Sequence, residues 1–159
     1  MSVTYIREAT LKYRGPRRGA TFDAVCSPER AVELMRRILP DNVREHFLTL
    51  FLNGANHVVG YFVAATGTAT SCIVGTKEVM QAALLAGAVS IILGHNHPSG
   101  ETVPSAEDRA VTKRLREAGE LLGIPVLDHL IIGDPGFYSF HGHGEIDARK
   151  HDSREALPF

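Results

Sequence analysis

Residues 88–100 read Ala88-Val-Ser-Ile-Ile-Leu-Gly-His-Asn-His-Pro-Ser-Gly100, and the segment Ser105-Ala-Glu-Asp108 follows four residues later. The largely apolar run 88–93 is short enough to be a buried strand, and it predicts one. We expect this strand to end at Gly94 and to deliver His95 into a loop that a helix beginning at Ser105 closes. The sequence therefore places its candidate site at the C-terminal end of a buried strand.

Two histidines and a carboxylate in this stretch have the spacing of a metal site. His95 and His97 are two residues apart, so both imidazoles can turn toward one point where Pro98 bends the chain. Asp108, in the first turn of the next helix, completes a His₂Asp set. Three protein ligands leave the fourth position of zinc for a water, whose pKa zinc lowers to about 7. Two alternatives stay open at this point: Ser105 and Asp108 also fit a capping box, and loop histidines are often only solvated or hydrogen-bonded.

The remaining patterns surround this stretch with helices and strands. A helix is predicted to begin after Ser27, its N-cap, and to stop at Pro40. The segment Asn53-Gly-Ala-Asn56 separates two apolar runs and predicts a β-hairpin, because Asn-Gly tolerates positive φ. The other predicted elements are the hairpin strands over 47–52 and 58–64, a helix from Thr76 to near Gly87, a helix from Ser105 to Gly123, and strands over 126–132 and 137–140. This alternation predicts an α/β sandwich.

Composition and charge are those of one ordinary globular domain. Of the 159 residues, 44% are apolar and 22% charged, and the formal net charge is −1. No apolar run approaches the ~20 residues that span a bilayer, so we expect no membrane insertion. The N-terminus lacks a secretory pattern, and Cys26 and Cys72 predict no disulfide framework, so we expect a cytoplasmic protein. We divide the chain into an N-terminal strand and basic loop (1–26), a domain over 27–145 and a polar tail (146–159).

The residues of the candidate site resemble a known family. The pattern H-x-H-P-x₆-S-x₂-D matches the signature of the JAMM (MPN+, JAB) metalloproteases, and Leu127-Asp-His129 with Leu130-Ile-Ile-Gly133 is similar to the RadC branch. The resemblance covers roughly residues 28–145. It implies a three-layer α/β/α sandwich with a mixed central sheet, of the cytidine-deaminase-like type. It further implies one zinc ion held by His95, His97 and Asp108, and hydrolysis of a peptide or isopeptide bond.

The resemblance also assigns two catalytic roles. Without the resemblance, Glu45 would be interpreted as an ordinary surface charge, because it is an acidic residue just ahead of the predicted strand 47–52. In the family, a glutamate before the first core strand is the general base that hydrogen-bonds the zinc-bound water, and Glu45 occupies the matching position. Such a carboxylate can accept the proton of the water and later donate it to the leaving amine. Ser105 would act both as N-cap and as a hydroxyl donor to the tetrahedral oxyanion.

Several polar residues near the end of the domain have structural interpretations. Asp128 and His129 are adjacent in a predicted strand, so their side chains point to opposite faces and form no local dyad. Structural hydrogen bonding is the first interpretation of this pair, and support of a zinc-bound histidine is the alternative. His141 and His143 repeat the His-x-His spacing, but no carboxylate follows at a comparable distance, so we treat them as tail residues. Tyr138 is expected in the core or at the sheet edge.

The sequence departs from RadC relatives in two places. Longer members carry an N-terminal helix–hairpin–helix module, which we expect this chain to lack, so a DNA-repair role transfers poorly. The segment Gly75-Thr-Lys-Glu-Val79 stands where relatives tend to have His-Pro-Arg-Glu-Val. This difference puts any function of that histidine or arginine in doubt for this chain.

Two functions follow as hypotheses. The first is a zinc-dependent hydrolase of peptide or protein-conjugate substrates, with Glu45 as base and Ser105 at the oxyanion. The alternative is a DNA-repair-associated or partner-binding protein that retains the metal site without proteolytic turnover. Its contact loop would carry Lys12, Arg14, Arg17 and Arg18. A phosphodiesterase is disfavoured because two-metal sites need more ligands. DNA binding and oligomerisation stay open, the latter through a predicted N-terminal edge strand.

Overall fold

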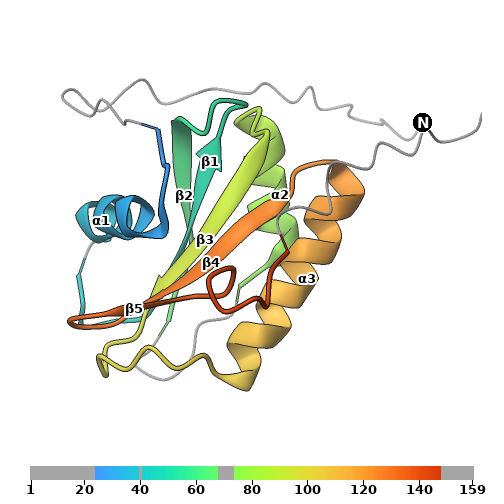
Figure 1. Cartoon of the computed structure of the whole chain (residues 1–159). Helices are drawn as coiled ribbons and strands as arrows, with labels where there is room; N and C mark the ends of the chain where they lie inside the picture. Colours follow the sequence, from blue (N-terminus) through green and yellow to red (C-terminus); the bar gives the residue numbers. More distant parts are fainter. Residues whose placement is uncertain (1–23, 40, 68–73, 148–159) are drawn as a thin grey trace, which may run out of the picture.

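A mixed sheet with helices on both faces makes up the described part of the chain (Figure 1). The computed structural model describes residues 24–39, 41–67 and 74–147. In chain order its elements are α1 (Pro28–Ile38), β1 (His46–Leu52), β2 (Val58–Thr66), α2 (Thr76–Leu85), β3 (Ser90–Asn96), α3 (Ala106–Leu122), β4 (Val126–Ile132) and β5 (Phe137–Ser139). The predicted α/β fold with a mixed sheet between helical layers is confirmed.

The strand order β2-β1-β3-β4-β5 places β1, β3 and β4 in the middle of the sheet, and one end of each of these strands meets at the same end of the sheet. β3 runs antiparallel to β1 and parallel to β4, while β1 with β2 and β4 with β5 are antiparallel. The C-terminal end of β3 therefore lies beside the start of β1 and the end of β4. His95, near that end of β3, pairs with Phe47 on β1 and with Ile131 on β4. A side chain here can meet residues from three separate parts of the sequence.

The β1–β2 hairpin forms as predicted, but a different residue adopts the left-handed conformation. Asn56, with φ 58°, takes it, and Gly54 does not. The Asn53 side chain accepts hydrogen bonds from the backbone N–H groups of Ala55 and His57, at 2.9 and 3.0 Å. The turn is therefore built around the Asn53 amide, since Asn side chains stabilise turns by bonding to the nearby backbone.

Helix α1 covers one face of the sheet. Ser27 caps it by accepting a hydrogen bond from the Arg30 N–H, and Pro28 occupies the first turn, as predicted. Its buried stripe packs on the inward residues of the central strands, which are Leu48, Leu50, Ile92, Leu130 and Ile132. Gly94 has no side chain because the Met35 sulfur occupies that position, 2.3 Å from where a Cβ would lie. The helix thus approaches β3 closely, one residue before His95.

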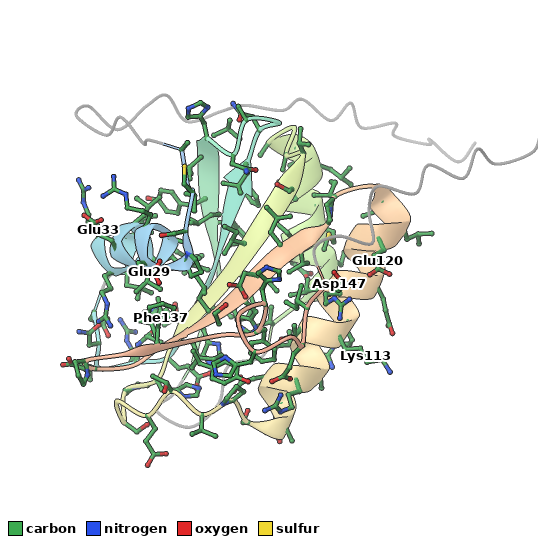
Figure 2. The ribbon with its side chains drawn as sticks, viewed as in Figure 1. Glu29, Glu33, Lys113, Glu120, Phe137 and Asp147 are labelled. Carbon is green, nitrogen blue, oxygen red and sulfur yellow. The ribbon has the colours of Figure 1, made fainter. Side chains whose placement is uncertain are left out.

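Helices α2 and α3 cover the opposite face (Figure 1). α3 turns a buried stripe toward the sheet through Val111, Thr112, Leu115 and Gly119, and Figure 2 shows Lys113 and Glu120 projecting away from it. Gly123, with φ 69°, ends α3 in the left-handed conformation that glycine adopts without strain. None of the helices in the described residues is both long and apolar enough to cross a membrane.

Strand β3 lies about two residues later in the chain than predicted, because it begins at Ser90 and not at Ala88. The sequence places its end at Gly94, whereas β3 continues through His95 to Asn96. The reason is the central position of β3. Both β1 and β4 pair with it at His95, so the strand pairing continues past Gly94. The first histidine is therefore fixed by sheet pairing on both sides, and only His97 belongs to the loop.

Some sequence predictions lie outside the described residues. These concern the N-terminal strand, the basic loop with Lys12, Arg14, Arg17 and Arg18, and Cys72. Ile146, which the predicted division assigns to the tail, is buried in the core at 2% exposure, so ordered packing extends past residue 145. The three-part division of the chain stays a prediction.

Candidate metal centre

Three side chains from two elements and one loop converge at the end of β3. The Nε2 atoms of His95 and His97 are 2.8 Å apart, and the Asp108 carboxylate lies 3.2 Å from the first and 3.6 Å from the second. One ligand atom from each residue lies within 4.8 Å of the others, so the group can hold a metal ion. The structure thus brings together the three residues that the sequence singles out as ligands.

The loop that carries His97 is held at both its backbone and its ring. The His97 N–H donates to the Ile132 carbonyl at 3.0 Å, which continues the contact between β3 and β4. The ring Nδ1 is 2.9 Å from the Glu101 carbonyl oxygen, which can only accept. Nδ1 therefore carries a hydrogen, and in the neutral ring of His97 the lone pair is at Nε2, the atom that faces His95 and Asp108.

Asp108 both caps helix α3 and faces the histidines. Its N–H donates to Ser105 Oγ at 3.1 Å, and its Oδ2 accepts from the Ser105 N–H at 2.6 Å. This reciprocal pair is a capping box. The two interpretations of Asp108 are therefore compatible, because the capping bonds fix the carboxylate while Oδ1 points at His95. Ser105 itself is exposed, and its hydroxyl retains a hydrogen to donate.

Glu45 lies at the same end of the sheet, just before β1. Its Oε1 is 3.8 Å from His95 Nε2, and its side chain is 15% exposed. The Asn96 amide fixes the backbone on both sides of it: Asn96 Oδ1 accepts from the His46 N–H at 2.9 Å, and Asn96 Nδ2 donates to the Arg44 carbonyl at 2.8 Å. The residue between the two motif histidines thus positions the carboxylate opposite them.

The protonation preferences of the cluster suit a cation site. Burial lowers the pKa of His95 to about 4, so its ring is neutral near pH 7. Burial acts to raise the pKa of Asp108, but hydrogen bonding to His97 and the neighbouring His95 outweigh it and hold that pKa well below its usual range. The hydrogen bond to Asp108 raises the pKa of His97. Glu45 has a raised pKa, mainly because it is partly buried. The arrangement presents an ionised carboxylate and the neutral imidazole of His95 to one point, whereas His97 holds its second proton more tightly and must lose it before a metal ion can bind.

Asp128 and His129 take separate roles, and their side chains do not pair with each other. Asp128 accepts hydrogen bonds from the His129 N–H, the Ser139 hydroxyl and the His141 N–H, at 2.7, 2.6 and 2.8 Å. Burial raises its pKa, against the lowering effect of these bonds. This carboxylate therefore holds the β4–β5 region together. The His129 ring instead lies 3.2 Å from His95, on the side away from His97.

The second His-x-His pair is placed away from the metal ligands. His141 Nδ1 is 2.9 Å from the Ile146 carbonyl, and His143 Nδ1 is 2.8 Å from the Ser139 carbonyl. The His143 ring also stacks on Tyr138, which lies on the edge strand β5 as expected. Both histidines belong to an ordered turn that packs on β4 and β5, so their interpretation as tail residues was wrong.

A scan against protein families finds one whose model matches this sequence across the site. The model for the RadC-like JAB domain matches residues 25–145, which include all three candidate ligands and Glu45. The chain belongs to the RadC-like JAB domain family. The resemblance inferred from residues 95–108 and 127–133 is therefore confirmed.

Curated relatives of this RadC-like JAB domain include several UPF0758 proteins. One from Geotalea uraniireducens is 44% identical over 130 residues, covering 82% of this chain and 57% of its own length. Others from Desulforamulus reducens and Trichlorobacter lovleyi are 48% and 44% identical, over 75% and 78% of this chain and 52% and 54% of their own lengths. The chain thus spans about half the length of the curated relatives it matches.

Two residues of this RadC-like site were missed at the sequence level. Asn96 was passed over as the variable position of the motif, although its alternation with His95 along a strand predicts a side chain on the opposite face. Thr112 follows Asp108 by four residues, a spacing that puts both on one face of α3. Helical spacing could have indicated that Thr112 lies near the ligands. Its contact with His129 on β4 depends on tertiary packing, which the sequence does not show.

Proposed function

We propose that this RadC-like JAB domain is a zinc-dependent hydrolase of peptide or isopeptide bonds. The observation that carries the proposal is the convergence of two imidazole Nε2 atoms and one carboxylate, with the separate carboxylate of Glu45 3.8 Å from His95 Nε2. His95, His97 and Asp108 form a ligand set. The Glu45 carboxylate, unlike that of Asp108, takes no part in the helix cap and is available as a base. A helix cap alone would require neither histidine nor Glu45.

The donor set fits zinc. Two imidazole nitrogens and one carboxylate oxygen from His95, His97 and Asp108 are ligands that zinc takes in catalytic sites, where a fourth position stays open. When bound, zinc lowers the pKa of a coordinated water and polarises a carbonyl oxygen. The anchoring of the His97 ring to the Glu101 carbonyl supports this assignment, because ligating histidines commonly donate their other N–H to such a group.

Glu45 serves as the proton carrier. Its carboxylate takes the proton of the attacking water and delivers it to the amine nitrogen that leaves when the amide bond breaks. Its raised pKa supports this role, because a general base works best when its pKa is closer to the operating pH. The two bonds from the Asn96 amide hold the peptide groups on either side of Glu45, so the carboxylate has a defined position.

Ser105 stabilises developing negative charge on the substrate carbonyl oxygen. Its Oγ accepts the Asp108 N–H, which orients the hydroxyl while leaving its hydrogen to donate. A single such donor contributes about 3–4 kcal/mol to the stabilisation of an oxyanion in other hydrolases. Loss of Ser105 should therefore slow turnover more than it weakens metal binding. The substrate we propose is a peptide or a protein conjugate.

The test combines metal content with turnover. We expect about one zinc per chain in the purified wild-type protein, by inductively coupled plasma mass spectrometry, and none in Asp108→Ala. His57→Ala, which removes an exposed histidine just before β2, is the matched control and should retain zinc. Glu45→Gln should retain zinc but lose cleavage of a mixed library of peptides and isopeptide conjugates, followed by mass spectrometry.

The outcomes separate the two hypotheses. Zinc in the wild type with no cleavage of any member of the library would favour a partner-binding protein that keeps the metal site. A wild-type protein that binds no zinc when zinc is supplied would remove the hydrolase proposal, and Asp108 would remain a helix cap. Loss of zinc in Glu45→Gln would contradict the role given to Glu45.

A further inference from the structure

The ring of His129 lies directly behind the candidate ligands. Its side chain is fully buried, between Phe47 and Phe140, with ring centroids 5.4 and 5.0 Å away. The ring Nε2 is 3.2 Å from His95 Nδ1, and the ring Nδ1 is 2.6 Å from Thr112 Oγ1. In both contacts the tautomer of the imidazole decides which atom donates. The direction of these bonds therefore determines which nitrogen of His95 carries a hydrogen.

Thr112 sets that direction. Its hydroxyl oxygen is 2.5 Å from the main-chain carbonyl oxygen of Asp108, one helical turn earlier. The carbonyl can only accept, so the single hydroxyl hydrogen of Thr112 goes to it. The hydroxyl oxygen then has only lone pairs left for His129. It accepts the hydrogen on His129 Nδ1.

The consequence passes through His129 to His95. With its hydrogen on Nδ1, neutral His129 has a lone pair at Nε2 and accepts a hydrogen from His95 Nδ1. His95 is then left with a lone pair at Nε2, the atom that is 2.8 Å from His97 Nε2 and 3.2 Å from Asp108. The reverse direction would put a hydrogen on His95 Nε2, where it would block a metal ion.

We propose that Thr112 and His129 are positioning residues that fix the tautomer of His95, so that its Nε2 lone pair points at the metal site. The inference rests on the proposed zinc site. The chain of hydrogen bonds starts at one ligand residue, His95, and ends at the main chain of another, Asp108. It thereby ties α3 to β3 through β4. The Glu101 carbonyl fixes the hydrogen of His97 on Nδ1 in the same way, so both imidazoles are oriented before a metal binds.

The direct test is the tautomeric state of the histidines in the metal-free wild-type protein. Long-range proton–nitrogen correlation spectra of protein with labelled histidine distinguish protonated from unprotonated ring nitrogens, and single His→Gln variants assign the signals. We expect a hydrogen on Nδ1 of both His129 and His95. A hydrogen on Nε2 of His129 would overturn the proposal. This measurement needs neither zinc nor a substrate, so it separates failure of the hydrogen-bond chain from failure of the proposed function.

A matched pair of variants tests the effect on metal binding. Thr112→Val removes the hydroxyl and keeps the branched shape, whereas Thr112→Ser keeps the hydroxyl. We expect zinc affinity, measured by competition with a chromophoric chelator, to fall about 10-fold in Thr112→Val and to be restored in Thr112→Ser. Thr112→Val should also lose the single tautomer of His129. A folded Thr112→Val protein with wild-type zinc affinity would overturn the proposal. If that variant does not fold, the spectra of the wild type still decide.

Discussion

The two His-x-His pairs of this chain have the same spacing but different surroundings. His95 and His97 lie at the end of the central strand β3, and their Nε2 atoms face each other and Asp108. His141 and His143 lie in a turn after the edge strand β5, and the Nδ1 atom of each is bonded to a backbone carbonyl. Among the described residues, only the first pair belongs to a group that can hold a metal ion.

The difference shows what turns a pair of histidines into a ligand set. Both pairs have an Nδ1 anchor, so anchoring alone does not distinguish them. The first pair adds a carboxylate from a separate element, fixed by the capping box of α3, and a central strand that holds one histidine between two neighbours. The second pair has Glu145 nearby in sequence, but that carboxylate is bound to Arg109 and Tyr138. A ligand set needs convergence of elements as well as spacing.

The largest predicted effect comes from removing one histidine of each pair. His97→Ala should weaken zinc binding by more than about 100-fold, because loss of a ligand costs more than the 10- to 100-fold typical of outer partners. His143→Ala should leave zinc affinity unchanged and lower the free energy of unfolding by about 1 kcal/mol, through loss of its bond to Ser139. Chelator competition measures the affinities, and chemical denaturation the stabilities. Equal loss of zinc in both variants would break the comparison.

The pH dependence of the first pair gives an intermediate effect. Zinc needs neutral His97, and the hydrogen bond to Asp108 raises the pKa of His97 above its ordinary value of 6.5. Zinc affinity should therefore fall about tenfold for each pH unit below that raised pKa, with one proton displaced per zinc. His95, with a pKa of about 4, and Asp108, ionised throughout, add no slope between pH 5 and 7. A slope of two protons, or of none, would contradict this assignment.

The same shift predicts the opposite trend for the metal-free protein. A raised histidine pKa contributes stability that is fully present below the unfolded value of 6.5 and is lost as the pH rises through the folded pKa. For this group, the metal-free protein is more stable at pH 6 than at pH 8, whereas zinc stabilises the protein more at pH 8. Thermal unfolding at the two pH values, with and without zinc, measures both trends. Circular dichroism at each pH checks that the fold is unchanged.

Much of the fold and of the ligand set could be predicted from sequence because local rules determine them. Ser27 and Pro28 mark the start of α1, the apolar runs mark the hairpin strands, and the spacing from His95 to Asp108 is a local pattern. The predicted end of β3 was wrong because the point where this strand ends depends on its pairing with β1 and β4, which are distant in sequence. The role of His129 was left as an alternative for the same reason: its contact with His95 arises only when β3 and β4 pair in parallel.

A pair of glycines gives the smallest predicted effect on zinc affinity and tests how tightly the His97 loop must be held. A Cβ on Gly133 would lie 2.3 Å from the Gly100 carbonyl oxygen, whereas one on Gly136 would lie 4.0 Å from the nearest atom, in Thr102. Gly133→Ala should therefore push the loop off the end of β4. It should cost about 1–3 kcal/mol of stability and reduce zinc affinity by less than about 10-fold.

Gly136→Ala is the matched control for this loop, because its added methyl group meets only ordinary van der Waals distances. It should leave both the stability and the zinc affinity close to those of the wild type. If Gly133→Ala loses stability but binds zinc as tightly as the control, the metal ion itself can pull His97 into place. The preformed loop would then be a feature of the fold, and the distinction between the two histidine pairs would rest on Asp108 and the central strand alone.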